Sequence, residues 1–126
     1  MKFYISCTSS QTHRAKALAQ RLRDAGHEVV STWHDLGDRK ISDEIGWTEK
    51  IRKYNFPEIE SADIHVAIQP GELVSGGMFV ETGYALGKGK AVASIGINMN
   101  PLMEAPAVKN FLTEDEFFAE LKKVCS

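Results

Sequence analysis

The residues of this chain that are best suited to chemistry lie between Ser75 and Lys90, where Glu81 follows a pair of glycines. Gly76 and Gly77 come after a small polar residue, and glycines allow a backbone to pass close to a ligand. They also precede a helical pattern, and the free N–H groups of a helix N-terminus favour anions and carboxylates. Glu81 would lie about one turn into that helix, where it is either a structural surface charge or a functional carboxylate.

The loop after the first apolar run offers a second set of polar groups. Its hydroxyls and backbone amides suit a sugar or a phosphate; alternatively, Ser10 or Thr12 caps the helix that follows. Tyr4 precedes this loop in a predicted strand, and either its hydroxyl reaches the site or its ring packs in the core. The loop comprises Cys7, Thr8, Ser9, Ser10, Gln11 and Thr12.

Other reactive residue types give weaker patterns. Trp33 follows the second predicted strand and could wall a flat base, although packing is the commoner role of such a residue. His65 alternates within an apolar run, so we expect it to pack in the sheet. The four histidines show no zinc spacing and no Cys–His pair accompanies Cys7, so we expect no metal, no cofactor and no thiol nucleophile.

Short apolar strands and amphipathic helices alternate along the chain and must position these residues. Gly26 is a helix stop signal, and Pro57 is expected to interrupt the second helix. The predicted strands are Lys2–Ser6, His27–Thr32, Asp63–Ile68, Ala91–Ile95 and Ala107–Leu112. The predicted helices are His13–Ala25, Asp43–Tyr54, Gly77–Gly87 and Glu114–Val124, the last with a capping box from Thr113 and Glu116.

This alternation predicts a parallel sheet covered by helices on both faces. We expect a flavodoxin-like open α/β sheet of about five strands in the order 2-1-3-4-5, as a single domain over residues 1–126. In such sheets ligands bind beyond the carboxyl ends of the strands, at the switch point between the first and third strands. That rule selects the loop 7–12 and the segment 69–77 as the two sides of a site.

Composition excludes several classes of function. The 126 residues are 43% hydrophobic and 25% charged, which is ordinary for a soluble globular domain and excludes global disorder. The net charge of −2 argues against a nucleic acid polymer or a membrane surface as partner. No apolar run reaches the length of a spanning helix and the first residues do not form a signal peptide, so we expect a cytoplasmic protein.

The segment Gly76–Lys90 resembles the nucleoside 2-deoxyribosyltransferase family and the related deoxynucleoside monophosphate N-glycosidases. The shared pattern there is Gly-Gly-x-x-x-Glu-x-Gly-Tyr-Ala-Leu-Gly-x-Gly-Lys. The likeness extends over most of the chain, but only this segment is specific. The other shared features are Lys2-Phe3-Tyr4-Ile5, the helix end from Leu22 to Val29, and the Ser61-Ala62-Asp63 run before the third strand.

The resemblance implies a reaction at C1′ of a 2-deoxyribosyl group, in a homodimer or higher homo-oligomer, with a nucleoside or nucleotide as the small-molecule partner. It implies that Glu81 is the nucleophile and that Tyr4 belongs to the site. At the position six residues before Glu81, transferases commonly have Asp and the monophosphate hydrolases have Ser, and this chain has Ser75. We therefore expect the substrate to be bound by Tyr4, Cys7, Thr8, Asn55, Ser75, Gly76, Gly77 and Met78.

The chain departs from the family at one position that matters for mechanism. The family places a base-contacting Asp eight residues before the Asp that precedes the third strand, and here that residue is Asn55. An amide cannot donate a proton as a carboxylic acid can. Protonation of the leaving base would then fall to another acid such as Asp35, Asp43 or Glu58, or the base would leave with little protonation.

Three functions compete for this pattern. The first is an N-glycosyl enzyme that passes the deoxyribosyl group to water or to another base. The second is a TIR-like module, which would share the strand, Ser/Thr loop and helix at the start and a Glu after the third strand, and would cleave NAD or serve as an interaction domain. The third is a nucleotide-binding protein without catalysis. The Gly76–Lys90 pattern favours the first.

Overall fold

The computed structural model describes residues 1–35, 44–71, 76–98 and 100–125. For residues 44–48 it describes the backbone alone. Ser75 and Asp43, which the sequence analysis named, lie outside the described residues. No described helix has both the length and the apolar character needed to cross a membrane.

A sheet of five parallel strands forms the centre of the molecule, in the order β2-β1-β3-β4-β5. Both the predicted fold class and the predicted strand order are confirmed. β1 and β3 lie side by side over four residue pairs, among them Tyr4 with His65. The strands are β1 (Lys2–Ser6), β2 (Glu28–Val29), β3 (Ile64–Ile68), β4 (Ala91–Ile95) and β5 (Val108–Phe111).

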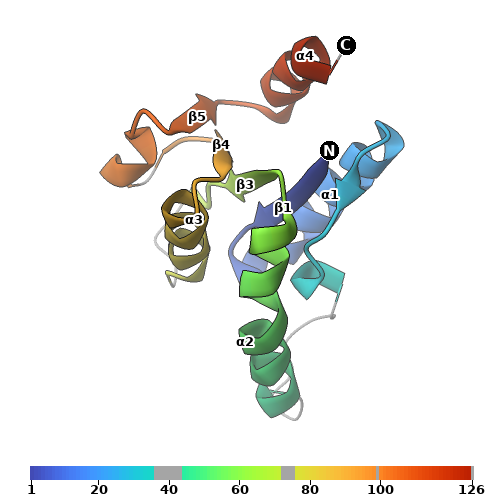
Figure 1. Ribbon diagram of the computed structural model, residues 1–126, viewed down its shortest axis with the longest axis vertical. Coiled ribbons are helices and arrows are strands. Elements are labelled where there is room, and N and C mark those ends of the chain that lie inside the picture. Colours follow the sequence, from blue (N-terminus) through green and yellow to red (C-terminus); the bar gives the residue numbers. More distant parts are fainter. Residues whose placement is uncertain (36–43, 72–75, 99, 126) are drawn as a thin grey trace.

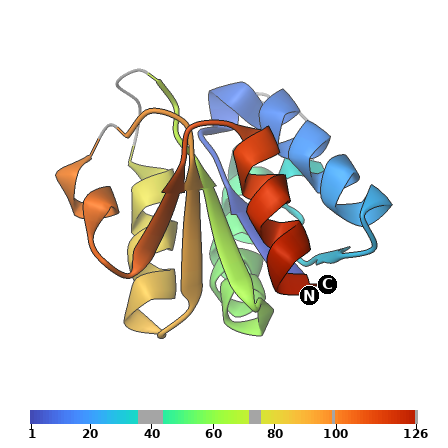
Figure 2. The ribbon, with the colours of Figure 1, turned by 90° about the horizontal axis from the view of Figure 1, so that it is seen from above.

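Two helices cover each face of this sheet. α1 (Thr12–Asp24) and α4 (Glu114–Cys125) lie on one face, and α2 (Glu44–Ser61) and α3 (Gly77–Gly87) lie on the other, as Figure 1 shows with the sheet nearly edge-on and Figure 2 from above. This three-layer arrangement buries both faces of the central strands, which explains their nearly continuous apolar sequences.

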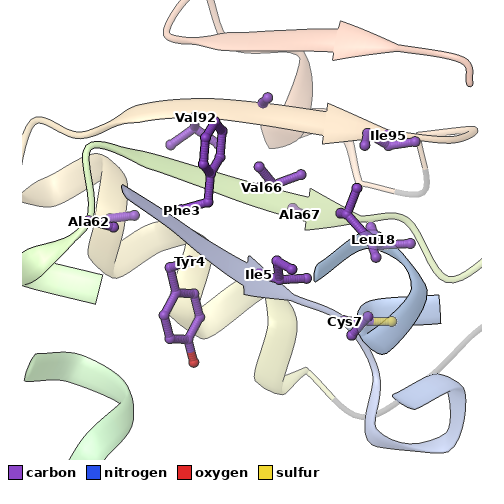
Figure 3. Close-up of a cluster of buried hydrophobic side chains, with 14 of the residues drawn as sticks. Phe3, Tyr4, Ile5, Cys7, Leu18, Ala62, Val66, Ala67, Val92 and Ile95 are labelled. Carbon is purple, nitrogen blue, oxygen red and sulfur yellow. The ribbon is translucent and has the colours of Figure 1, made fainter. Parts of the chain in front are cut away.

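The alternation of side chains along β1 divides the core between the two faces. Phe3 points toward one face and Tyr4 toward the other (Figure 3). Phe3 meets the ring of Phe117 from α4 edge-on, with centroids 6.3 Å apart. Tyr4 is equally buried, with 0% of its surface exposed, but its hydroxyl points toward the α2 and α3 side. The core therefore places one polar group of β1 among the elements that carry Asn55 and Glu81.

Three local predictions are corrected. Pro57 does not interrupt the second helix: α2 runs to Ser61, because Ile59 beyond the proline is fully buried and tertiary packing holds the last turns. The second strand covers only Glu28–Val29 and not His27–Thr32. Neither Ser10 nor Thr12 caps α1, whose first residue follows the short 3-10 turn at Ser9–Gln11 without a side-chain cap.

Candidate active site

Glu81 accepts hydrogen bonds from three side chains that come from two other elements. The Tyr4 hydroxyl and the Asn55 Nδ2 group both donate to Oε2, the latter at 2.8 Å. The Ser6 hydroxyl donates to Oε1 at 2.9 Å. A carboxylate oxygen offers about two acceptor sites, so Oε2 is filled and Oε1 keeps one open.

Each of these donors is placed by its own element. Tyr4 and Ser6 are two residues apart on β1, so they share the face that α2 and α3 cover. Asn55 is buried on α2, with 8% of its surface exposed. Phe56 stacks on Tyr84 with ring centroids 4.3 Å apart, and the Tyr84 hydroxyl donates to Glu60 at 2.5 Å. These contacts hold α2 against α3 and keep Asn55 opposite Glu81.

Burial raises the pKa of the Glu81 carboxyl above its usual range, and the nearby Glu58 carboxylate acts in the same direction. The hydrogen bonds from Tyr4, Ser6 and Asn55 oppose this by stabilising the ionised form. The net direction is upward, because the loss of solvent outweighs these hydrogen bonds. Burial and Glu81 also raise the pKa of Tyr4 far above its usual range, so the phenol stays protonated and donates.

Glu81 opens onto a pocket of about 430 Å3 between α2, α3 and the loop after β1. This volume lies within the ~300–1,000 Å3 typical of small-molecule sites. The pocket lies at the carboxyl end of β1, where the switch-point rule predicted it. Its walls are formed by Cys7, Thr8, Ser9, Trp33, Ile51, Arg52, Asn55, Phe56, Gly77, Met78, Val80 and Glu81.

The predicted binding residues do not all take the same part in this pocket. Cys7, Thr8, Gly77 and Met78 line it, whereas Gly76 is the N-cap of α3 and is absent from the described wall. A Cβ placed on Gly77 would meet no atom within 4 Å, so packing of the protein does not require glycine there. The space beside Gly77 is therefore open to a ligand.

Cys7 and Trp33 are held in ways that argue against direct chemistry. Burial raises the pKa of the Cys7 thiol to about 11, so it is protonated at neutral pH and a poor nucleophile. Trp33 is 5% exposed and its indole N–H donates to the Ile5 carbonyl at 2.7 Å. Trp33 thus fills the packing role that the sequence favoured and also forms part of the pocket wall.

His65 lies behind the site, on β3. Its ring stacks on that of Tyr4, with centroids 5.3 Å apart and an interplanar angle of 13°. The Thr82 hydroxyl donates to the Met78 carbonyl at 2.8 Å, so it accepts from His65 Nε2 at 3.1 Å. Burial lowers the pKa of His65 to about 3, which keeps the ring neutral. This neutral His65 supports both the Tyr4 ring and the residue after Glu81.

Two of the alternative acids named from the sequence, Glu58 and Asp35, are not among the described residues that line this pocket. The Glu58 carboxylate accepts from the Thr32 backbone N–H at 3.0 Å and from the Thr32 hydroxyl at 2.6 Å. Asp35 pairs with Arg23 at 3.8 Å. Asp43 lies outside the described residues.

Sequence reasoning missed Ser6 and Arg52. Ser6 was signalled by its place two residues after Tyr4 on one strand, which puts both on the same face. Arg52 was signalled by its place three residues before Asn55 on one helix, which brings the two side chains together. Ser9, Ile51, Phe56 and Val80 were also missed as pocket residues.

Fold and site together define an α/β enzyme that holds a buried carboxylate beside a pocket at the edge of a parallel sheet. The sequence model described as nucleoside 2-deoxyribosyltransferase matches residues 5–116. The chain therefore belongs to the nucleoside 2-deoxyribosyltransferase family and is an enzyme of that family. A comparison with curated proteins gives no significant match.

Two solved structures share the fold. A 2-deoxyribosyltransferase from the psychrotolerant bacterium Bacillus psychrosaccharolyticus superposes with a TM-score of 0.75 at 23% identity, over 93% of this chain and 90% of that one. The CMP N-glycosidase BcmB of Clostridium botulinum superposes with a TM-score of 0.67 at 19% identity, over 97% of this chain and 98% of that one. At these identities the likeness shows the shared fold.

Proposed function

We propose that this protein cleaves the N-glycosidic bond of a 2′-deoxyribonucleoside or its 5′-monophosphate, with Glu81 as the nucleophile. The observation that supports this most directly is the set of hydrogen bonds from Tyr4, Ser6 and Asn55 to the Glu81 carboxylate beside the pocket. Three donors fix the direction of the carboxylate, and an oriented carboxylate is what attack at C1′ requires.

Cleavage builds positive charge at C1′ and the ring oxygen of the sugar. A carboxylate below the ring stabilises that charge and can trap it as a glycosyl-enzyme, as in retaining glycosidases. Oε1 is the attacking atom, because Tyr4 and Asn55 already fill the acceptor sites of Oε2. Water or a second base then attacks C1′ from the opposite side and releases Glu81. Attack by water gives hydrolysis, and attack by a second base gives transfer.

The substrate would lie with its sugar against the loop after β1. Thr8 and Ser9 line the pocket there, next to the first turn of α3 at Gly77. Hydroxyls and free amides of this kind bind sugar oxygens and phosphates. We therefore propose a modest preference for the 5′-monophosphate, in line with the Ser75 signature; equal kcat/KM on a nucleoside and its 5′-phosphate contradicts this preference.

The test of the function is release of free base from a panel of deoxynucleosides, their 5′-monophosphates and NAD. We expect release from deoxyribosyl substrates by the wild type, and a fall to less than about a tenth in Glu81→Ala, which corresponds to at least about 1.4 kcal/mol of barrier. Mass spectrometry after a slow 2-fluoro substrate should find the sugar on the Glu81 peptide. Activity in Glu81→Ala above a tenth of wild type contradicts the assignment, and activity on NAD alone favours the TIR-like alternative.

We also propose that the active unit is a homodimer or a higher homo-oligomer. Phe117 and Met103 are apolar but lie in the core with 3% exposure each, so they do not form that contact. Ile97 follows β4, Leu102 lies in the 3-10 turn Pro101–Glu104 and Leu112 follows β5, and these residues are 72%, 78% and 68% exposed. Exposed apolar side chains of this size are candidates for a contact surface. Sedimentation of the wild type and of Leu102→Glu tests this, and a fully active monomer contradicts it.

A further inference from the structure

Asn55 does not offer the leaving base the proton that a carboxylic acid would offer. Its Nδ2 group already donates to Glu81 Oε2 at 2.8 Å, and an amide does not ionise at neutral pH. Among the described residues that line the pocket, the titratable groups besides Glu81 are Cys7 and Arg52. Because burial raises the pKa of the Cys7 thiol to about 11, that thiol is a weak acid. Departure of the base therefore needs a different kind of assistance.

Arg52 places a positive charge on the wall of this pocket. It lies on α2 three residues before Asn55, so the two side chains share one face of the helix, and both line the pocket. Arg21 pairs with Asp115 and Arg23 with Asp35, whereas no described carboxylate pairs with Arg52. Its guanidinium is thus available to a ligand.

The surroundings of Arg52 suit a nucleobase. Ile51 and Phe56 on α2 give this part of the pocket apolar walls, and Val80 on α3 adds to them. Flat apolar walls accept the faces of a base, and a base bound there would cover these partly exposed side chains from water. Arginine presents a planar set of N–H donors that matches oxygen acceptors and that remains charged at any pH of interest.

We propose that Arg52 stabilises the nucleobase as it leaves, by placing its guanidinium against the negative charge that develops on the base. The inference rests on the proposed function. A cation here stabilises the leaving base, which an acid would otherwise do by protonating it. Arg52 thereby compensates for an amide at position 55.

The electron balance of the step is simple. Glu81 Oε1 forms a bond to C1′ while the bond from C1′ to the base nitrogen breaks, and its electron pair goes to the base. In a 2-oxopyrimidine that pair delocalises onto the oxygen beside the leaving nitrogen, where Arg52 N–H groups donate to it. The base leaves as an anion and takes its proton from water. The substrates that benefit most are 2-oxopyrimidine deoxyribosides.

The experiment compares leaving groups. Wild type and Arg52→Gln are assayed on 2′-deoxyuridine and on 5-fluoro-2′-deoxyuridine, whose base leaves more readily as an anion, each as nucleoside and as 5′-monophosphate. Removing one oriented donor from developing charge costs about 10²–10³-fold, so we expect a loss of that order in kcat/KM on 2′-deoxyuridine. The loss should be clearly smaller on the 5-fluoro substrate, and added guanidinium ion should restore part of the activity of Arg52→Ala.

Lys53→Gln is the matched control. It removes the same charge from the neighbouring residue, which does not line the pocket, so its kinetics should stay near those of the wild type. An equal loss on both leaving groups, or a loss confined to the 5′-monophosphates, overturns the inference, and the second result would assign Arg52 to the phosphate. A wild type that releases no base from any substrate overturns the proposed function and this inference with it, whereas an active wild type with an unchanged Arg52→Gln overturns only this inference.

Discussion

Asn55 on α2 and Glu81 on α3 both line the pocket and are joined by a hydrogen bond of 2.8 Å from Nδ2 to Oε2. The residue at which the sequence resemblance predicts a departure from the family is thus in contact with the proposed nucleophile. In the proposed reaction, this contact links the departure of the base to the ionisation of Glu81.

Asn55→Asp should change both the pH dependence and the base preference of the enzyme. Two carboxyls within hydrogen-bond distance cannot both ionise readily, so one pKa of the pair rises and one proton stays in the site at neutral pH. We expect the loss of activity on the acid side to begin at a higher pH than in the wild type. We also expect the cleavage rate for bases that leave poorly to rise relative to the rate for bases that leave readily. Asn55→Ala, which removes the donor without adding a charge, serves as control. Unchanged kinetics on every base in Asn55→Asp would place residue 55 outside the site.

Tyr4→Phe should lower activity mainly by making Glu81 harder to ionise. The Tyr4 hydroxyl stabilises the carboxylate and lowers its pKa, against the larger effect of burial. A hydrogen bond to a charged group contributes about 1.5–3 kcal/mol, so kcat/KM near neutral pH should fall by about tenfold or more. The acid limb of the pH–rate profile should move to higher pH, and part of the activity should return there. A uniform loss at all pH values would indicate a different role for Tyr4.

Glu81→Gln should stabilise the fold at neutral and alkaline pH. Because burial raises the pKa of Glu81, the folded state holds its proton at pH values where the unfolded state has released it. The wild type therefore loses stability as pH rises from the ordinary carboxyl pKa through the raised one. Urea unfolding of both proteins across pH should give Glu81→Gln a higher free energy of unfolding than the wild type at high pH. The difference should vanish in acid. If the two proteins differ in free energy of unfolding by the same amount at every pH, the ionisation of Glu81 is not the cause.

Thr82→Val should destabilise the fold through His65. The hydroxyl of Thr82 is the acceptor for the buried His65 Nε2 group at 3.1 Å, and valine of the same shape removes it. An unsatisfied buried donor costs about 1–3 kcal/mol, which urea unfolding would detect. Thr82→Ser keeps the hydroxyl and should lie much closer to the wild type. A Thr82→Val protein as stable as the wild type would contradict this role of the hydrogen bond.

Much of the fold could be predicted because the signals are local. Short apolar runs separated by amphipathic stretches indicated the strand order and placed the site at the end of β1, and the bounds of α3 agree with the pattern Gly77–Gly87. The interruption predicted at Pro57 does not occur, because the burial of Ile59 stabilises the helix beyond the proline.

The sequence by itself determined the residue types of the site and, through the Gly76–Lys90 pattern, the family to which they belong. Tertiary structure alone decided which of those residues meet. Residues 4, 6, 55 and 81 come together because α2 and α3 pack on the face of the sheet toward which β1 directs residues 4 and 6. No local pattern encodes the distance between α2 and α3. The ionisation of Glu81 was likewise decided by tertiary structure, because the loss of solvent around a carboxylate depends on every element that covers it.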